Sequence, residues 1–270
     1  MVYLILICFG CLAGISSVLF GFGGGFVVVP LLYITLNDLY GTGSVIGHEA
    51  IHIAVATSTC VMIVSATFST LKHNKLGNIL WEYIFPFAFY IAIGSICGAI
   101  VTSFVQSKWV HYAFLVYLAA TIMDCILRSG FTDHDIEEKR SLNKLEKIGG
   151  GLGIGFIGTF IGVGGGVMTV PLLRRKGLSM TQATAMANPL SLAVALSGTL
   201  TYIAFSIVHP LKIDGWFIGY IDLPAFAVLT ISSLLGIQIA TKFIGKIPDK
   251  IHAQVYIFLL FLVMLSMIYK

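Results

Sequence analysis

One glycine-proline pattern occurs twice in the sequence, and this repeat decides the fold. Residues 14–32 read GISSVLFGFGGGFVVVPLL, and residues 155–173 read GFIGTFIGVGGGVMTVPLL. At a constant offset of 141 residues, 9 of the 19 positions are identical. Chance similarity between two apolar runs would match scattered Leu and Val. An ordered pattern of Gly and Pro indicates instead that the chain is a duplication. The identical residues of the first copy are Gly14, Gly21, Gly23, Gly24, Gly25, Val29, Pro30, Leu31 and Leu32.

The composition excludes an ordinary water-soluble enzyme. The 270 residues are 57% hydrophobic and 10% charged, with a mean hydropathy of +0.96, whereas a soluble domain carries about 25% charged residues. At about 20 residues per membrane-spanning helix, the length allows roughly six to ten crossings. The net charge of +4 comes from a few loop residues, so it bears on orientation in a bilayer and gives no support to nucleic-acid binding.

Eight apolar stretches recur along the chain, and two of them are interrupted by three consecutive glycines. The first stretch is about twice as long as one crossing requires. Each interrupted stretch is therefore predicted to form a helix, a break and a second helix. The most polar connection, residues 129–147, is predicted to be a cytoplasmic linker between membrane repeats at 1–128 and 148–270. The apolar stretches are residues 1–36, 53–71, 83–107, 109–127, 148–173, 177–208, 223–241 and 251–269.

The loop charges distinguish two topologies. If each broken stretch crosses once, nine basic residues lie on one side and seven on the other. If each broken stretch enters the membrane and returns to the same side, thirteen basic residues lie on one side of the membrane. Only Lys108, Lys212 and Lys270 then lie on the other, which is the positive-inside pattern. Three ordinary crossings then remain in each half, so the halves insert in opposite orientations, as in many secondary transporters. The prediction is an all-α, multi-pass protein of the cell membrane, with two inverted repeats and both termini outside.

The glycine breaks are candidate anion sites. A helix that begins inside the bilayer exposes N–H groups with partial positive charge, and glycine lets a ligand approach the backbone. Pro30 and Pro171 are expected in the first turn of limbs that begin a few residues after the glycines. The alternative is that the glycines only permit tight helix crossing. We favour the anion site because the glycines are contiguous, followed by Pro and duplicated. The candidate substrate-binding residues are Gly23, Gly24, Gly25, Gly164, Gly165 and Gly166.

A second, weaker sequence similarity between the halves follows each break. Ala54-Val55-Ala56-Thr57-Ser58 matches Ala185-Met186-Ala187-Asn188-Pro189, with polar side chains at the same place. Thr57, Ser58 and Asn188 can donate hydrogen bonds to an anion. Hydrogen bonding between helices explains them equally well.

Three ionisable residues precede the segment that carries Thr57. His48 and His52 share one helical face, with Glu49 between them, and a proton-coupling role near the outer mouth is one interpretation. An interfacial cluster that faces water is the other. The cluster offers too few ligands for a metal, and no metal or cofactor is predicted. The apolar segments contain no Ser-His or Asp pair and no H-E-x-x-H, so we predict that the chain is not an enzyme.

The doubled element resembles the sulfite exporter TauE/SafE family of membrane permeases. GFGGGFVVVPLL and GVGGGVMTVPLL, each followed by an A-x-A-[TN]-[SP] segment, carry a resemblance that covers essentially the whole chain. It implies export of a small anion such as sulfite, sulfoacetate or another organosulfonate, coupled to a proton or ion gradient. The family usually shows Gly-Thr-Ser at the second element, whereas this chain has Ala56-Thr57-Ser58 and Ala187-Asn188-Pro189. An anion channel and a non-transporting assembly or sensor subunit are the alternatives.

Overall fold

The computed structural model describes residues 2–41, 43–128, 131, 142–208 and 215–269. Within these residues, seven helices are long and apolar enough to cross a membrane, as the multi-pass prediction requires. Most of the residues predicted as a linker lie outside the described part. The elements are α1 (Val2–Phe20), α2 (Gly25–Tyr40), α3 (Val45–His48), α4 (Ala50–Lys75), α5 (Trp81–Ile84), α6 (Phe87–Phe104), α7 (Ser107–Leu127), a π-helical turn (Glu146–Gly150), α8 (Gly151–Phe160), α9 (Gly166–Arg174), α10 (Met180–Val208), β1 (Phe217–Ile218), β2 (Ile221–Asp222), α11 (Leu223–Thr241) and α12 (Asp249–Ile268).

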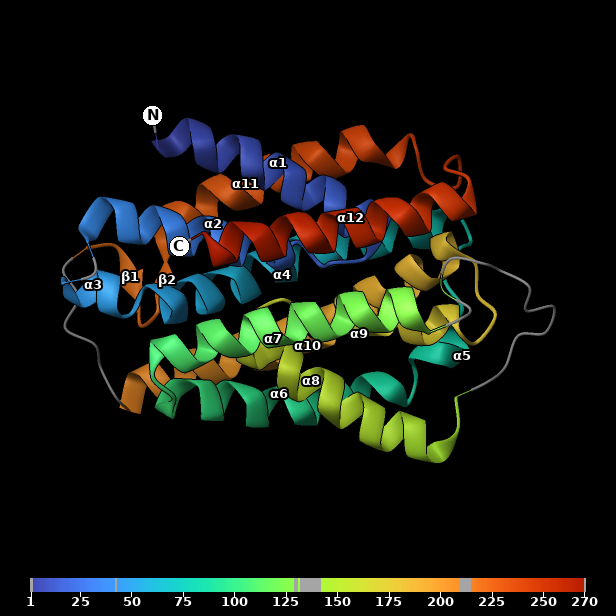
Figure 1. Cartoon of the computed structure of the whole chain (residues 1–270), viewed down its shortest axis with the longest axis horizontal. Coiled ribbons are helices and arrows are strands. Elements are labelled where there is room, and N and C mark those ends of the chain that lie inside the picture. The colour runs from blue at the N-terminus through green and yellow to red at the C-terminus, as the bar shows by residue number, and fades with distance from the viewer. Residues whose placement is uncertain (1, 42, 129–130, 132–141, 209–214, 270) are drawn as a thin grey trace.

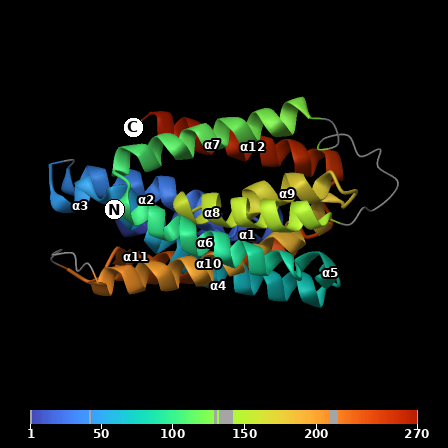
Figure 2. The ribbon, with the colours of Figure 1, turned by 90° about the horizontal axis from the view of Figure 1, so that it is seen from below.

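Each glycine-broken stretch forms a helical hairpin. Figure 1 shows α2 running back toward the end of the bundle where α1 begins, and α9 running back toward the opposite end, where α8 begins. The helices α4 and α10 pack against each other, and each contacts a hairpin limb from both halves. Figure 2 shows α7 and α12 together on one side of the bundle and α4 and α10 on the other, with α2, α8 and α9 between them.

The contacts of one half recur in the other. The first limb α1 packs on α11, and the first limb α8 packs on α6. A β-carbon on Gly236 of α11 would lie 2.0 Å from the carbonyl oxygen of Cys11, and one on Gly94 of α6 would lie 2.1 Å from that of Leu152. No β-carbon tolerates such a distance, so glycine at these two positions permits the close crossing of helices.

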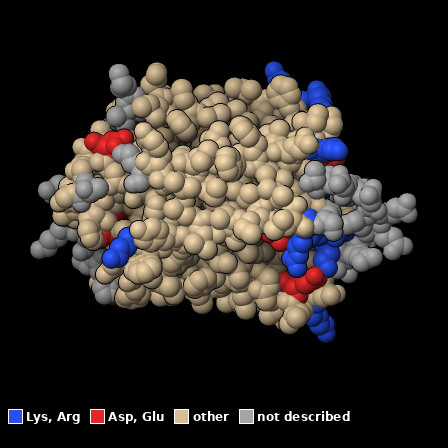
Figure 3. Space-filling view, viewed as in Figure 1, with Lys and Arg blue, Asp and Glu red and all other residues tan. Residues whose placement is uncertain are grey.

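Charge and apolar surface are separated along the bundle. Figure 3 shows that, on the visible face, most Lys and Arg side chains gather at the end where α8 begins, while the middle of that face carries none. Large apolar side chains cover the outer faces of the helices, among them Val116 at 69% exposure and Ile231 at 65%. An apolar belt between charged ends is the surface that a bilayer requires.

One local prediction is wrong. The second limbs begin at the third glycine of each triplet, Gly25 and Gly166, so Pro30 and Pro171 lie in the second turn of α2 and α9. A proline there leaves the carbonyl group four residues earlier without its helical donor. In α9 that carbonyl belongs to Val167, and the hydroxyl of Tyr256 in α12 donates to it at 2.9 Å. A tertiary hydrogen bond thus replaces the helical one.

Candidate functional site at the two glycine breaks

Both breaks use backbone conformations that favour glycine. Gly21, Gly23 and Gly24 have φ angles of 73°, 67° and 92°, and Gly162 and Gly164 have 73° and 78°. A residue with a side chain is strained at positive φ. The breaks are therefore specified by the sequence and do not result from tertiary packing alone.

The two breaks meet at the centre of the molecule in a reciprocal contact. A β-carbon on Gly25 would lie 2.6 Å from the carbonyl oxygen of Gly162, and one on Gly166 would lie 1.8 Å from that of Gly21. The offset of 141 residues relates Gly25 to Gly166 and Gly21 to Gly162. Reciprocal contacts of this kind are what two copies related by a two-fold axis form.

Backbone donors remain free at the start of both second limbs. Among the described residues, the N–H groups of Gly24, Gly25, Gly165 and Gly166 donate to no hydrogen bond. The first N–H groups of a helix have no partner within the helix and carry partial positive charge. Two such helix starts, buried and facing a common centre, form a potential anion site.

Ser191 of α10 lies at this centre, although it belongs to neither of the two repeated sequence patterns. Its hydroxyl oxygen would be 3.2 Å from a β-carbon on Gly166 and 3.4 Å from one on Gly164, and its β-carbon 3.0 Å from one on Gly23. The side chain is fully buried, and its hydroxyl has no hydrogen-bond partner in the described part of the chain. Such a group costs free energy unless something binds it. The available signal was its position three residues after Asn188, on the same face of the helix.

Two of the three predicted polar donors hold the breaks in place. The hydroxyl of Ser58 donates to the carbonyl oxygen of Gly162 at 2.8 Å, which joins α4 to the second break. Asn188 donates from its amide nitrogen to the carbonyl oxygen of Thr184 at 3.0 Å, and its side-chain oxygen accepts from Ser17 of α1 at 3.3 Å. Both side chains are fully buried. In this conformation they bind protein groups next to the breaks.

Thr57 lies apart from the other two donors. It is buried, but its hydroxyl points toward the short hairpin of β1 and β2. It accepts a hydrogen bond from the backbone N–H of Asp222 at 3.0 Å and donates to the carbonyl oxygen of Tyr220 at 3.5 Å. Thr57 thus anchors the β hairpin to α4.

The predicted cluster of His48, Glu49 and His52 forms at the start of α4. Glu49 accepts from Nδ1 of His52 at 2.7 Å and lies 3.2 Å from Nδ1 of His48. Nε2 of His52 donates to the carbonyl oxygen of Val105 at 2.9 Å. The hydrogen bond from His52 holds the pKa of Glu49 below its ordinary value of 4.5, although partial burial acts in the opposite direction. The cluster is a connected ionisable group, separate from the breaks.

A second pair of histidines caps the end of α1 immediately before the first break. Nε2 of His73 donates to the carbonyl oxygen of Val18, and Nε2 of His252 donates to that of Leu19, both at 2.7 Å. The matching carbonyl groups at the end of α8 accept instead from hydroxyl groups, Tyr202 to Thr159 and Thr102 to Phe160. Both hairpins thus satisfy the orphan carbonyls of their first limb, the first with imidazole N–H groups and the second with hydroxyl groups.

Three consecutive basic residues fasten the end of α9 to three other elements. Each forms an ion pair with a carboxylate from a different segment of the chain. Arg174 has no exposed surface, and it also donates to the carbonyl oxygens of Phe131 and Leu178. The pairs are Arg174 with Asp249, Arg175 with Asp124, and Lys176 with Glu146.

No group of three or more His, Cys, Asp or Glu side chains that could hold a metal ion occurs among the described residues.

Comparison with known proteins finds relatives that are described as membrane transporters. A protein of Haemophilus influenzae called probable membrane transporter protein is 29% identical over 98% of both chains. A second protein with that description, from Methanocaldococcus jannaschii, is 27% identical over 90% of this chain and 88% of its own. The family model described as sulfite exporter TauE/SafE matches residues 6–267. The family match covers nearly the whole chain, both glycine-broken hairpins included, and the chain therefore belongs to the sulfite exporter TauE/SafE family.

Proposed function

We propose that this protein is a secondary transporter that exports a small anion, such as sulfite, sulfoacetate or another organosulfonate. The family and the names of the relatives support a membrane transporter rather than an enzyme. The observation that carries the choice of an anion is the buried hydroxyl of Ser191, which has no partner among the described residues and lies beside two helix starts with free N–H groups. All of these groups are hydrogen-bond donors, and an oxyanion accepts from several donors at once.

The site suits reversible binding. The donors are N–H dipoles and a hydroxyl, and the ion pairs that we described lie away from the breaks, at the ends of the helices. An anion held by dipoles and hydroxyls is bound less tightly than one that forms a buried ion pair. Transport requires binding that is strong enough for entry and weak enough for release.

Alternating access follows from the arrangement of the halves, which we propose are inverted repeats. The reciprocal glycine contacts and the hairpins that start from opposite ends of the bundle support this proposal. In the present conformation the sulfur of Met62 lies close to both Gly23 and Gly164 and fills the centre. Methionine is unbranched and flexible, so its side chain can move when a hairpin moves. Rocking of each hairpin against α4 and α10 would expose the site to one side and then to the other.

Coupling to a proton gradient has two candidate locations. His48, Glu49 and His52 form a connected ionisable cluster at the start of α4. The second location is the pair of buried histidines His73 and His252, which donate to carbonyl groups at the end of α1, just before the first break. Nδ1 of His252 has no partner within the described residues. A small void is lined by both rings together with Thr181 and Thr184. A proton bound at the caps would change the charge at the end of α1, next to the break that has to move.

The test is uptake of labelled sulfite and sulfoacetate into proteoliposomes, with and without an imposed proton gradient. Accumulation that the gradient drives uphill supports a coupled transporter. Downhill flux without uphill accumulation under a gradient would favour the anion channel, and absence of flux for a wide set of anions would favour the non-transporting subunit.

The variant Gly165→Val tests whether the glycine break itself takes part in transport. Gly165 has an ordinary φ of −75°, and the nearest atom to a β-carbon there is a side-chain methyl of Ile154 at 3.0 Å. The variant should fold and lose flux.

A further inference from the structure

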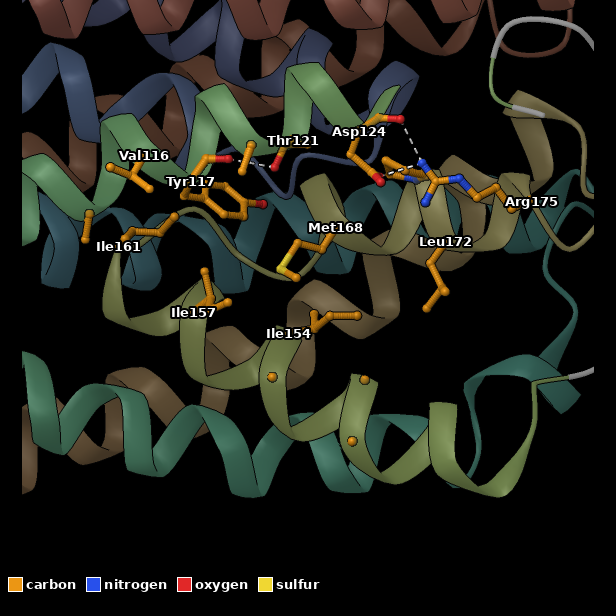
Figure 4. A pocket seen from close by; sticks show the side chains of 16 residues that line it. Val116, Tyr117, Thr121, Asp124, Ile154, Ile157, Ile161, Met168, Leu172 and Arg175 are labelled. Carbon is orange, nitrogen blue, oxygen red and sulfur yellow. Dashed lines mark hydrogen bonds and ion pairs between the residues drawn. The ribbon is translucent and has the colours of Figure 1, made fainter. Parts of the chain in front are cut away.

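A large cavity lies in a groove between α7 and the second hairpin (Figure 4). Its volume is about 670 Å³. The walls are almost entirely apolar, and a polar group, the ion pair of Asp124 with Arg175, stands at one end. The groove extends from this pair to Ile161 and Met168, which flank the second glycine break.

The groove is open on the outer surface of the bundle. Val116, which lines it, is 69% exposed, and Ala120 is exposed one turn further along α7. In a membrane-spanning helix this surface faces lipid. The natural occupant therefore comes from the bilayer.

Two glycines line the groove at positions where neither helix packing nor a positive φ angle requires glycine. A β-carbon on Gly149 or Gly153 would meet no atom within 4 Å. By contrast, one on Gly155 would lie 1.9 Å from the carbonyl oxygen of Ile91, so that glycine is required by helix packing. Glycine in a helix is less stable than alanine by about 1 kcal/mol. The empty side of the helix at Gly149 and Gly153 is thus space for a molecule other than this chain.

The polar end of the groove carries an excess of positive charge. Asp124 accepts from Arg175 and lies 3.5 Å from Arg128, so one carboxylate faces two guanidinium groups. Nε of Arg175 is buried and has no partner among the described residues. Lys147 precedes Gly149, which lines the same end. This is the end where Lys and Arg gather (Figure 3), and the headgroups of anionic lipids attract such clusters.

We propose that this groove binds one anionic phospholipid. An acyl chain lies along Gly149 and Gly153 toward Met168, and the phosphate accepts hydrogen bonds from the exposed guanidinium group of Arg128 and lies near Lys147. A bound chain would lie between α7 and the second hairpin, where it would resist movement of that hairpin. The lipid would therefore regulate the proposed transport cycle, but its binding can be measured without any transport.

The experiment is native mass spectrometry of the purified protein in mild detergent, with phosphatidylglycerol or phosphatidylcholine added at equal concentration. We expect one phosphatidylglycerol per chain, retained at least tenfold better than phosphatidylcholine. Ala120→Leu and Gly153→Leu fill the groove and should lower retention at least tenfold. The matched control is Ala227→Leu, an equal enlargement at an exposed position of α11.

A second pair of variants tests the headgroup. Arg128→Gln combined with Lys147→Gln should abolish the preference for phosphatidylglycerol, whereas Lys246→Gln, an exposed lysine outside the groove, should not. Equal retention of both lipids by the original protein would overturn the proposal. So would equal behaviour of Ala120→Leu, Gly153→Leu and Ala227→Leu, or a dimer that carries no lipid, which would assign the groove to a second copy of the chain.

Discussion

Ser191 combines complete burial with a hydroxyl that forms no hydrogen bond in the described structure. Replacing it with alanine removes an unpaired buried hydroxyl and no hydrogen bond of this conformation, so Ser191→Ala should unfold at the same temperature as the original protein or at a higher one. If the hydroxyl donates to the anion, the loss should weaken binding by about 1.5 to 3 kcal/mol, which is roughly 10- to 150-fold in affinity. The measurement is the concentration dependence of anion uptake.

The matched control for Ser191 is Ser197, also in α10. Its hydroxyl donates to the carbonyl oxygen of Ala193 at 2.7 Å, away from the breaks. Ser197→Ala should leave anion uptake unchanged. Unaltered affinity in Ser191→Ala would remove this residue from the site.

At the start of α4, Glu49 gives the protein a pH-dependent contribution to stability. Its hydrogen bond from His52 holds its pKa below the ordinary value of 4.5. A carboxyl group with a depressed pKa stabilises the folded state above its ordinary pKa, and this contribution is lost as the pH falls through the depressed value. Glu49→Gln should therefore lower the unfolding temperature at pH 7, and this difference should be smaller at pH 3 than at pH 7. Glu82→Gln, at an exposed carboxyl group, is the control at both pH values.

Some of these residues could be predicted from the sequence and others could not. Ser58 and Asn188 were found because they lie in the two matching segments that follow the breaks, and both lie beside the breaks. Ser191 is one of several serines in an apolar helix, and nothing local distinguishes it from Ser197. Its importance depends on Gly23 and Gly164, residues that only the folded chain brings close to it.

At the scale of elements, the length of each apolar stretch predicts the membrane-spanning helices well. The apolar stretch 53–71 corresponds to α4, and 109–127 corresponds to α7. The short elements α3, α5 and the β1–β2 hairpin were not predicted, because a span of two to four residues at the edge of the bilayer leaves no periodic signal. The second limbs were predicted to start too late, since the fold replaces the helical hydrogen bond that Pro171 removes with one from Tyr256.

The end of α9 depends on Arg174 more than on any exposed charge. This guanidinium group is fully buried, pairs with Asp249 and donates to two backbone carbonyl groups. Arg174→Met removes the ion pair with Asp249 and leaves the buried carbonyl oxygens of Phe131 and Leu178 without their donor, which destabilises the folded state. We expect a markedly lower unfolding temperature in detergent. Arg128→Met serves as the control, because the side chain of Arg128 is 72% exposed and its pair with Asp124 spans 3.5 Å. Similar unfolding temperatures for the two variants would contradict this role of Arg174.

At the scale of the whole molecule, the repeat explains why the contacts of one half recur in the other. The limb α1 packs on α11 as α8 packs on α6, and the two breaks contact each other reciprocally. From the sequence alone, the loop charges favoured a returning hairpin over a single crossing for each glycine-broken stretch, and both stretches form hairpins in the structure. The sequence did not predict which helices pair between the halves, because the residues that Gly94 and Gly236 contact are evident only in the folded chain.

The proposed inverted arrangement predicts the side of the membrane on which each loop lies. If both termini are outside, the loop after α2 is also outside, and the segment between α11 and α12 is inside. Single cysteines at Gly43 and Lys246, both exposed, test these two positions in a variant whose native cysteines have been replaced. A membrane-impermeant thiol reagent added to intact cells should label Gly43→Cys and should label Lys246→Cys only after the membrane is permeabilised. Labelling of both positions in intact cells would contradict the hairpin topology. The five helices α4, α6, α7, α10 and α11 lie between the two positions, and the returning hairpin of α8 and α9 adds no net crossing, so the number of crossings between them is odd. Labelling of Lys246→Cys alone would keep the hairpins but reverse the orientation, and the basic residues would then lie outside, against the positive-inside rule.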